Sequence, residues 1–194
     1  SPPETSIDCK ILDTIAWTTF ALSALLSFVS CFDSDLDSDL DSDLDSDLDS
    51  DLDLDLIISF SAPSIFKSEL LSLPKKGCIN LHCSLLPKYS GILPSFWTLF
   101  NDEKETGATV HYMDDEIDNG DILGQKSVEI LKTDSMFDII KRTKKTGGTL
   151  MVDVIHNIMT NNIKLIKNKV NHEKYHSWPT DLDFKNFAKK RNLI

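Results

Sequence analysis

A four-residue repeat near the front of the chain limits how much of it can form a packed core. The tetrapeptide Asp-Ser-Asp-Leu occurs five times in succession over residues 33–52, and residues 33–55 hold twelve Asp but no Lys or Arg. Strict alternation is typical of a strand, but Asp is poor in strands and aligned carboxylates repel one another. This composition favours a solvated, disordered spacer. A calcium-binding array is the alternative, although the Gly turns that shape calcium loops are absent.

The acidic tract also accounts for the charge of the chain. The formal net charge is −11, with 31 acidic and 20 basic side chains. Without the twelve Asp of the tract, 19 acidic side chains face those 20 basic ones. The global acidity therefore says little about a substrate, and no strongly basic surface indicates DNA binding.

The four cysteines and the apolar front segment bear on localisation. Cys9, Cys31, Cys78 and Cys83 form no CxxC pair and have no His at metal-ligand spacing, so we expect no zinc site and a reducing, cytoplasmic compartment. Residues 15–32 are 18 residues without a charge, near the lower length limit of a membrane span. Their Ser and Thr content favours a buried apolar helix, with a membrane anchor as the alternative.

The body of the chain alternates between strand and helix patterns. We expect a buried strand over 54–60, a short helix over 67–73, a strand over 78–82 and a helix over 94–100. Two further strands are predicted over 108–113 and 124–130, and a long helix from residue 135, with Thr133 or Asp134 as N-cap and a weak point at Gly147–Gly148. Strands that alternate with helices favour an α/β domain with a largely parallel sheet.

Polar side chains at the end of one predicted strand mark a candidate site. Asn80 and His82 are two residues apart, so both side chains point to the same face. Asp118 follows the next strand, in an acidic loop. A carboxamide can stabilise an oxyanion, an imidazole can transfer protons, and a carboxylate can orient the imidazole. These residue types favour acyl transfer. Cys83 is an alternative nucleophile, but the base that it would need is better explained as part of the Asn–His pair.

Two longer motifs resemble a known family. The run INLHCSLLPKYSG (79–91), followed by ETGATVHYMDDEIDNGDIL (105–123), is similar to the 10-formyltetrahydrofolate-dependent formyltransferases. The family includes the methionyl-tRNA, glycinamide ribonucleotide and sugar N-formyltransferases, and the resemblance covers about 54–162. It implies a partial Rossmann-like α/β fold. We therefore divide the chain into an apolar segment (1–32), the acidic tract (33–55), a catalytic core (56–162) and a tail (163–194).

The resemblance also assigns residues. Asn80, His82 and Asp118 match the catalytic trio of the family, and His111 matches a further histidine that supports the site. The residues implied in folate binding are Ser84, Leu85, Leu86 and Pro87 of the loop after the strand, Ile65 and Phe66 within the segment 63–66, and Asp115 within the acidic turn 114–117. The implied co-substrate is 10-formyltetrahydrofolate, and neither a metal nor a covalent acyl-enzyme is implied.

The resemblance leaves the amine substrate open. Methionyl-tRNA is favoured by the core, and an amino-sugar nucleotide is second. We expect an N-terminal half that is truncated or replaced, because 1–53 is too short for the strand–helix units that open these enzymes, so an inactive remnant or a non-catalytic folate-binding module is the alternative. Residues 131–194 carry 13 basic and 6 acidic side chains, which is typical of a solvated helix face and alternatively attracts RNA. The run 175–184 indicates an aromatic clasp that closes the domain.

Overall fold

The computed structural model describes residues 53–60, 65–170 and 175–191, which all belong to one compact unit, Asp45–Ile194. The predictions for the apolar segment 15–32, for the acidic tract up to residue 52 and for residues 63 and 64 lie outside the described residues. Within the described part, no helix combines the length and the apolar character needed to cross a membrane. The predicted domain boundaries at residues 56 and 162 stay predictions.

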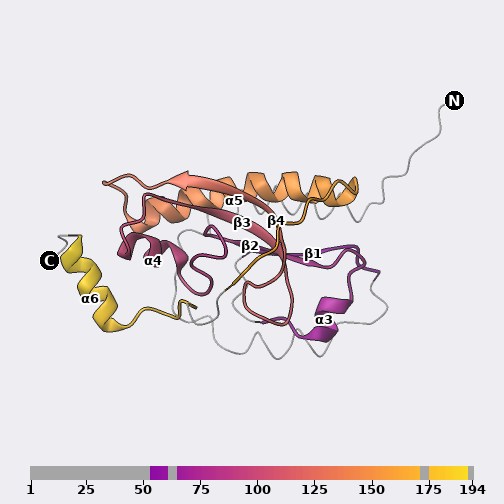
Figure 1. Ribbon diagram of the computed structural model, residues 1–194, viewed down its shortest axis with the longest axis horizontal. Helices are drawn as coiled ribbons and strands as arrows, with labels where there is room; N and C mark the ends of the chain where they lie inside the picture. Colours follow the sequence, from indigo (N-terminus) through magenta and orange to yellow (C-terminus); the bar gives the residue numbers. More distant parts are fainter. Residues whose placement is uncertain (1–52, 61–64, 171–174, 192–194) are drawn as a thin grey trace. The chain divides into compact units, whose positions relative to one another are not determined.

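A single sheet of four strands organises the described residues (Figure 1), in the order β1-β2-β3-β4. The strands are β1 Ile57–Phe60, β2 Cys78–His82, β3 Glu105–Tyr112 and β4 Ile122–Glu129. The predicted α/β class is confirmed. Only β1 and β2 pair in parallel, while β2–β3 and β3–β4 are antiparallel, so the described sheet is mixed. The loop 113–121 joins β3 to β4 without a crossover helix, and such a connection requires antiparallel strands.

The first strand is shorter and less buried than its sequence predicts. It begins at Ile57 rather than at residue 54, three of its residues are half-buried, and Phe60 is exposed. Among the described strands, β1 pairs only with β2 and lies at the edge of the sheet. An edge strand keeps one side open, so an apolar run can be less buried than in the middle of a sheet.

Four helices accompany the sheet in the described residues: α3 Ser68–Ser72, α4 Pro94–Phe100, α5 Met136–Met159 and α6 Asp181–Lys190. The predicted helices over 67–73 and 94–100 are confirmed. The predicted N-cap of the long helix is wrong. Ser135 caps α5 in a reciprocal capping box with Asp138, whereas the buried Asp134 carboxylate binds Arg142 and the backbone N–H of Leu131.

Helix α5 packs on one face of the sheet, and the core forms between them (Figure 1). Side chains alternate along a strand, so β2 and β3 present one set of residues to the helix and leave the other set on the opposite face. The Gly147–Gly148 pair does not interrupt α5. The buried core contains Ile79 and Leu81 of β2, Ala108 and Val110 of β3, and Leu150, Met151, Val154 and Ile158 of α5.

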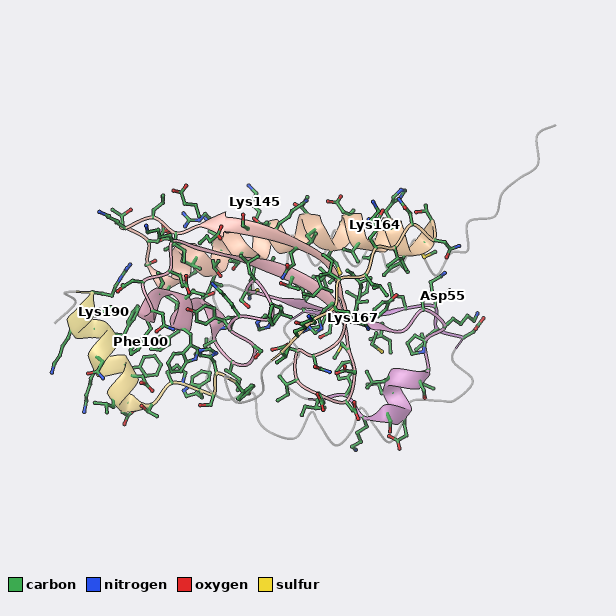
Figure 2. All side chains as sticks on the ribbon, viewed as in Figure 1. Asp55, Phe100, Lys145, Lys164, Lys167 and Lys190 are labelled. Atoms are coloured by element: carbon green, nitrogen blue, oxygen red, sulfur yellow. The ribbon has the colours of Figure 1, made fainter. Side chains whose placement is uncertain are left out.

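An aromatic cluster attaches α6 to α4. The ring of Phe96 lies 5.1 Å from that of Phe184 and 5.0 Å from that of Phe187, between centroids. A second link joins two residues that Figure 2 labels: the Lys190 ammonium donates to the Phe100 carbonyl at 2.6 Å. The sequence did not predict α6 separately, although Thr180 and Asp183 form a capping box at its start. The tail therefore packs on α4. Of the aromatic residues in the expected clasp 175–184, Phe184 packs on Phe96, while Tyr175 and Trp178 are exposed.

Candidate functional site

The candidate site lies on the face of β2 that points away from α5. Asn80 and His82 alternate with the core residues Ile79 and Leu81, and each of the two polar residues is only 6 % exposed. Across the antiparallel pair, Asn80 stands opposite His111. The predicted same-face placement of Asn80 and His82 is therefore confirmed, and the strand pairing adds a second imidazole to them.

The protonation of His111 follows from its neighbours. Its Nδ1 lies 2.7 Å from the Tyr112 carbonyl oxygen, which can only accept, so Nδ1 carries the proton. Burial is the largest effect on its pKa and lowers it below the ordinary 6.5, against the raising effect of the Asp118 charge. In the neutral ring, Nε2 is then an acceptor, and Asn80 Nδ2 donates to it at 3.4 Å. His111 thus fixes the orientation of the Asn80 carboxamide.

His82 is held from both sides. Its Nε2 lies 2.9 Å from the backbone carbonyl oxygen of Tyr89 and therefore donates to it. Its Nδ1 faces Asp118 Oδ2 at 3.4 Å. In the neutral ring Nδ1 has the free lone pair. A proton bound there would lie between His82 Nδ1 and Asp118 Oδ2 and interact with both. The pair can therefore take up and return one proton.

Several contacts position Asp118 in the acidic loop. Its backbone is left-handed, with φ 51°, a conformation that Asp adopts more easily than most residues. The Gly91 N–H donates to Asp118 Oδ2 at 2.7 Å, and Asn168 Nδ2 donates to the Asp118 carbonyl at 2.6 Å. Asp118 Oδ1 lies 3.7 Å from His111 Nε2. One carboxylate therefore reaches both imidazoles of the site.

The predicted folate loop follows β2 directly. The backbone N–H of Leu86 donates to Thr109 Oγ1 at 3.1 Å, and its carbonyl accepts from Gln125 Nε2 at 2.7 Å. Ser84 is buried and donates to the Lys88 carbonyl at 2.9 Å, Leu85 is half-buried and Pro87 is exposed. Both backbone polar groups of Leu86 are therefore engaged within the protein. The assignment of this loop to folate binding stays a prediction.

The other predicted pocket residues lie on either side of this loop in the sequence, Ile65 and Phe66 before it and Asp115 after it. Ile65 is 57 % exposed, Phe66 is half-buried and Asp115 is exposed. Within the described ranges, no hydrogen bond or ion pair joins these three residues to the trio. A separate hollow of about 520 Å³ is lined by Asp102, Glu103, Lys104, Glu105, Ser127 and Glu129, none of which belongs to the predicted site.

Some residues that shape the site carried no sequence signal for that role. The contributions of Tyr89 and Gly91 are backbone groups, and these depend on the path of the loop rather than on side-chain type. Asn168 lies fifty residues from Asp118 in the sequence and is one of many polar residues in the tail. Only His111 had a signal, its place in the second motif, and the structure adds that it contacts Asn80 and Asp118.

Comparisons with known proteins bear on the family of this chain. A methionyl-tRNA formyltransferase of Desulforamulus reducens is 40% identical over 100 residues, which cover 52% of this chain and 32% of the relative. A crystal structure of a 4-N formyltransferase from Francisella tularensis has a TM-score of 0.56 and 32% identity, covering 68% of this chain and 52% of the other. The formyltransferase PseJ from Anoxybacillus kamchatkensis, solved in complex with UDP-4,6-dideoxy-4-formamido-L-AltNAc and tetrahydrofolate, has a TM-score of 0.57 and 29% identity over 63% of this chain and 64% of PseJ.

A family model decides the assignment. The chain spans about a third of the length of the curated relatives it matches. The model described as "Formyl transferase" matches residues 29–155, which is more than half of the chain and includes β1 to β4 and most of α5. The chain therefore belongs to the formyl transferase family.

Proposed function

We propose that this chain transfers a formyl group from 10-formyltetrahydrofolate to an amine. The observation that carries the proposal is the cluster of the buried Asn80, His82 and His111 with Asp118, whose side chain is 10 % exposed; each side chain contacts at least one other member. A buried polar cluster of this kind is costly unless its groups are paired or used, and it is where proton transfer and oxyanion stabilisation are efficient. Family membership supports formyl transfer as that use.

An unpaired buried atom supports a ligand at this place. Asn80 Oδ1 is buried and has no hydrogen-bond partner in the structure, while Asn80 Nδ2 uses one of its two N–H groups on His111. An unsatisfied buried acceptor costs about 1–3 kcal/mol, so a bound donor would recover free energy here. The second N–H of Asn80 stays available for a developing oxyanion. The complex of PseJ with tetrahydrofolate supports folate as the co-substrate.

The proposed reaction is direct transfer. The amine nitrogen attacks the formyl carbon on N10, a C–N bond forms, and the carbonyl electron pair moves to the oxygen, where Asn80 donates a hydrogen bond. The proton that the amine loses is taken up between His82 Nδ1 and Asp118 Oδ2. Collapse of the tetrahedral intermediate breaks the C–N10 bond, and the proton passes to N10 as it leaves. The net products are a formamide and tetrahydrofolate.

Two amine substrates are supported by different comparisons. The chain is similar in sequence to methionyl-tRNA formyltransferases, one of them at 40% identity over 100 residues, which favours an aminoacyl-tRNA. The structural neighbours favour an amino-sugar nucleotide, because PseJ was solved with a formamido sugar nucleotide. We propose methionyl-tRNA first and the sugar nucleotide second. A non-catalytic folate-binding module is the other candidate.

Two measurements test the proposal. Calorimetry with a non-transferable folate analogue, in the wild-type chain and in His82→Ala, tests folate binding, which we expect in both proteins. Single-turnover transfer from 10-formyltetrahydrofolate to each amine, followed by mass spectrometry, tests catalysis. We expect a formamide product only with the wild-type chain. The amine that yields this product is then the substrate. Binding without transfer would favour the non-catalytic module, and absence of binding to wild type would overturn both candidates.

A further inference from the structure

The loop 89–92 holds both proton-carrying members of the candidate site by backbone groups. The Tyr89 carbonyl accepts from His82 Nε2 at 2.9 Å, and two residues later the Gly91 N–H donates to Asp118 Oδ2 at 2.7 Å. The separation between His82 Nδ1 and Asp118 Oδ2 therefore depends on the position of this one loop. Whatever fixes the loop also fixes the pair.

A segment of the tail, Tyr175 to Ser177, fixes the loop; we call residues 175–177 the strap. The His176 N–H donates to the Ser90 carbonyl at 2.9 Å, and the His176 carbonyl accepts from the Ile92 N–H at 2.7 Å. These two bonds bracket Gly91, which pairs with His176 as an isolated parallel bridge. A Cβ at Gly91 would lie 2.3 Å from the His176 carbonyl oxygen and 2.6 Å from the Tyr175 ring, and the φ of Gly91 is +106°. Glycine is therefore required for the strap to come this close.

Side chains hold the strap in turn. The His176 ring lies between two aromatic rings, 5.0 Å from that of Tyr89 and 5.3 Å from that of Trp97, measured between centroids. Trp97 Nε1 donates to the Ser177 carbonyl at 3.1 Å and thereby joins the strap to α4. The Tyr89 hydroxyl is anchored on Glu103 at 2.8 Å. The strap is thus tied to α4 through Trp97, and the loop 89–92 is tied through Tyr89 to Glu103, which lies between α4 and β3.

We infer that His176 is a positioning residue of the candidate site, acting through the strap and the loop 89–92 on His82 and Asp118. The effect of His176 on catalysis rests on the proposed function. Its effect on the positions of His82 and Asp118 does not. His176 touches neither member of the pair: it contacts Tyr89, Ser90, Ile92 and Trp97. A change at His176 should therefore loosen the Tyr89 carbonyl from His82 while it leaves the hydrogen bond of His111 to Tyr112 in place.

The structural part can be read from the imidazole protons. In the full chain labelled with ¹⁵N-histidine, the His82 Nε2 proton and the His111 Nδ1 proton are both held by backbone carbonyls and should exchange slowly. In His176→Ala we expect the His82 proton to exchange at least about tenfold faster and the His111 proton to keep its rate. Trp97→Phe keeps an aromatic ring but removes the bond to Ser177, so it should show the same selective effect in a milder form. Trp178→Ala, beside the strap and 54 % exposed, is the control and should change neither proton.

Formyl transfer gives the second readout. We expect His176→Ala to lower kcat roughly tenfold with folate affinity nearly unchanged, because positioning affects the transition state more than binding. The inference is overturned if the His82 proton keeps its wild-type exchange rate in both variants, if both protons accelerate equally, or if Trp178→Ala has the same effect. If the His82 proton responds as expected but the wild-type chain transfers no formyl group, the proposed function fails and the positioning contact stands.

Discussion

Asp118 Oδ2 lies 3.4 Å from His82 Nδ1, and the same oxygen accepts the Gly91 N–H at 2.7 Å. Because the other nitrogen of His82 is committed to the Tyr89 carbonyl, the ring cannot rotate toward another acceptor without losing that bond. The two side chains are therefore held in one relative orientation. In the proposed reaction, Asp118 acts through its negative charge, which stabilises a proton on His82, and not only through its shape.

Asp118→Asn separates charge from shape. Asn also tolerates the left-handed backbone at this position and can still accept the Gly91 N–H through its carbonyl oxygen. Without the negative charge, a proton taken up by His82 is no longer stabilised, so we expect kcat for formyl transfer to fall by about 10²–10⁴-fold. Single-turnover kinetics would measure the loss. Asp153→Asn, which removes an exposed carboxylate on α5, serves as the control, and an equal loss there would contradict a specific role for Asp118.

Burial of His111 predicts a pH dependence of stability. Burial lowers its pKa in the folded chain below the ordinary 6.5, so the unfolded chain binds more protons in the window just below pH 6.5. The free energy of unfolding should therefore be highest above pH 6.5 and should fall as the pH decreases through that window. His176 contributes in the same direction, because burial also lowers its pKa.

Urea unfolding between about pH 5 and 8 would measure this dependence. We expect His111→Gln to flatten the slope below pH 6.5, since Gln does not titrate, even if it also lowers the stability overall. The exposed His156 on α5 provides the matched control, and His156→Gln should leave the slope as in wild type. A stability that is constant or rises toward acid in the wild-type chain would contradict the prediction.

The sequence predicted the parts of the site that depend on strand periodicity. Asn80 and His82 lie on one face because they are two apart in a strand, and this holds whatever the loops do. That Asp118 joins them came from the resemblance, because no spacing rule relates a loop residue to a strand 36 positions earlier. The contacts of Tyr89, Gly91 and His176 were not predictable, because they form between backbone groups whose positions are set by left-handed residues and by a distant segment.

The fold was predictable to a similar degree. Helix α4 has the predicted bounds and β2 the predicted residues, since each is delimited by Gly or Pro and by a clear apolar pattern. The sheet is less parallel than the alternation of elements indicated, because β3 and β4 are joined by a loop and because β2 and β3 pair antiparallel although α4 lies between them in the sequence. Pairing direction is a long-range property, and composition carries little information on it.

The start of α5 allows a sharp test of helix capping. Ser135 accepts the Asp138 N–H at 3.2 Å, and Asp138 accepts the Ser135 N–H at 2.9 Å. Ser135→Ala removes one half of this box, and we expect it to lower the free energy of unfolding by about 1 kcal/mol. Thr133→Ala tests one of the two N-caps that the sequence predicted. It should be nearly neutral, because Thr133 is exposed and lies two residues before the cap. Equal losses in the two variants, measured by urea unfolding, would place the start of the helix differently.

The two adjacent glycines of α5 should respond to alanine with opposite signs. Gly147 is buried, and a Cβ there would lie 2.7 Å from Leu81 Cδ2 and 3.2 Å from Ala108 Cβ, at the contact between the helix and the sheet. We expect Gly147→Ala to destabilise the fold by about 1–2 kcal/mol, because overpacking outweighs the better helix propensity.

Gly148 is half-buried and has space for a Cβ, so Gly148→Ala should stabilise by about 0.5–1 kcal/mol through helix propensity alone. Thermal and urea unfolding of the two variants beside wild type would measure both signs. Because the substitution is identical and the positions are neighbours, the difference between the variants isolates the packing of α5 on β2 and β3. Stabilisation by both variants would mean that α5 lies farther from Leu81 than the structure indicates. The helix would then not pack tightly against the face of β2 opposite Asn80 and His82.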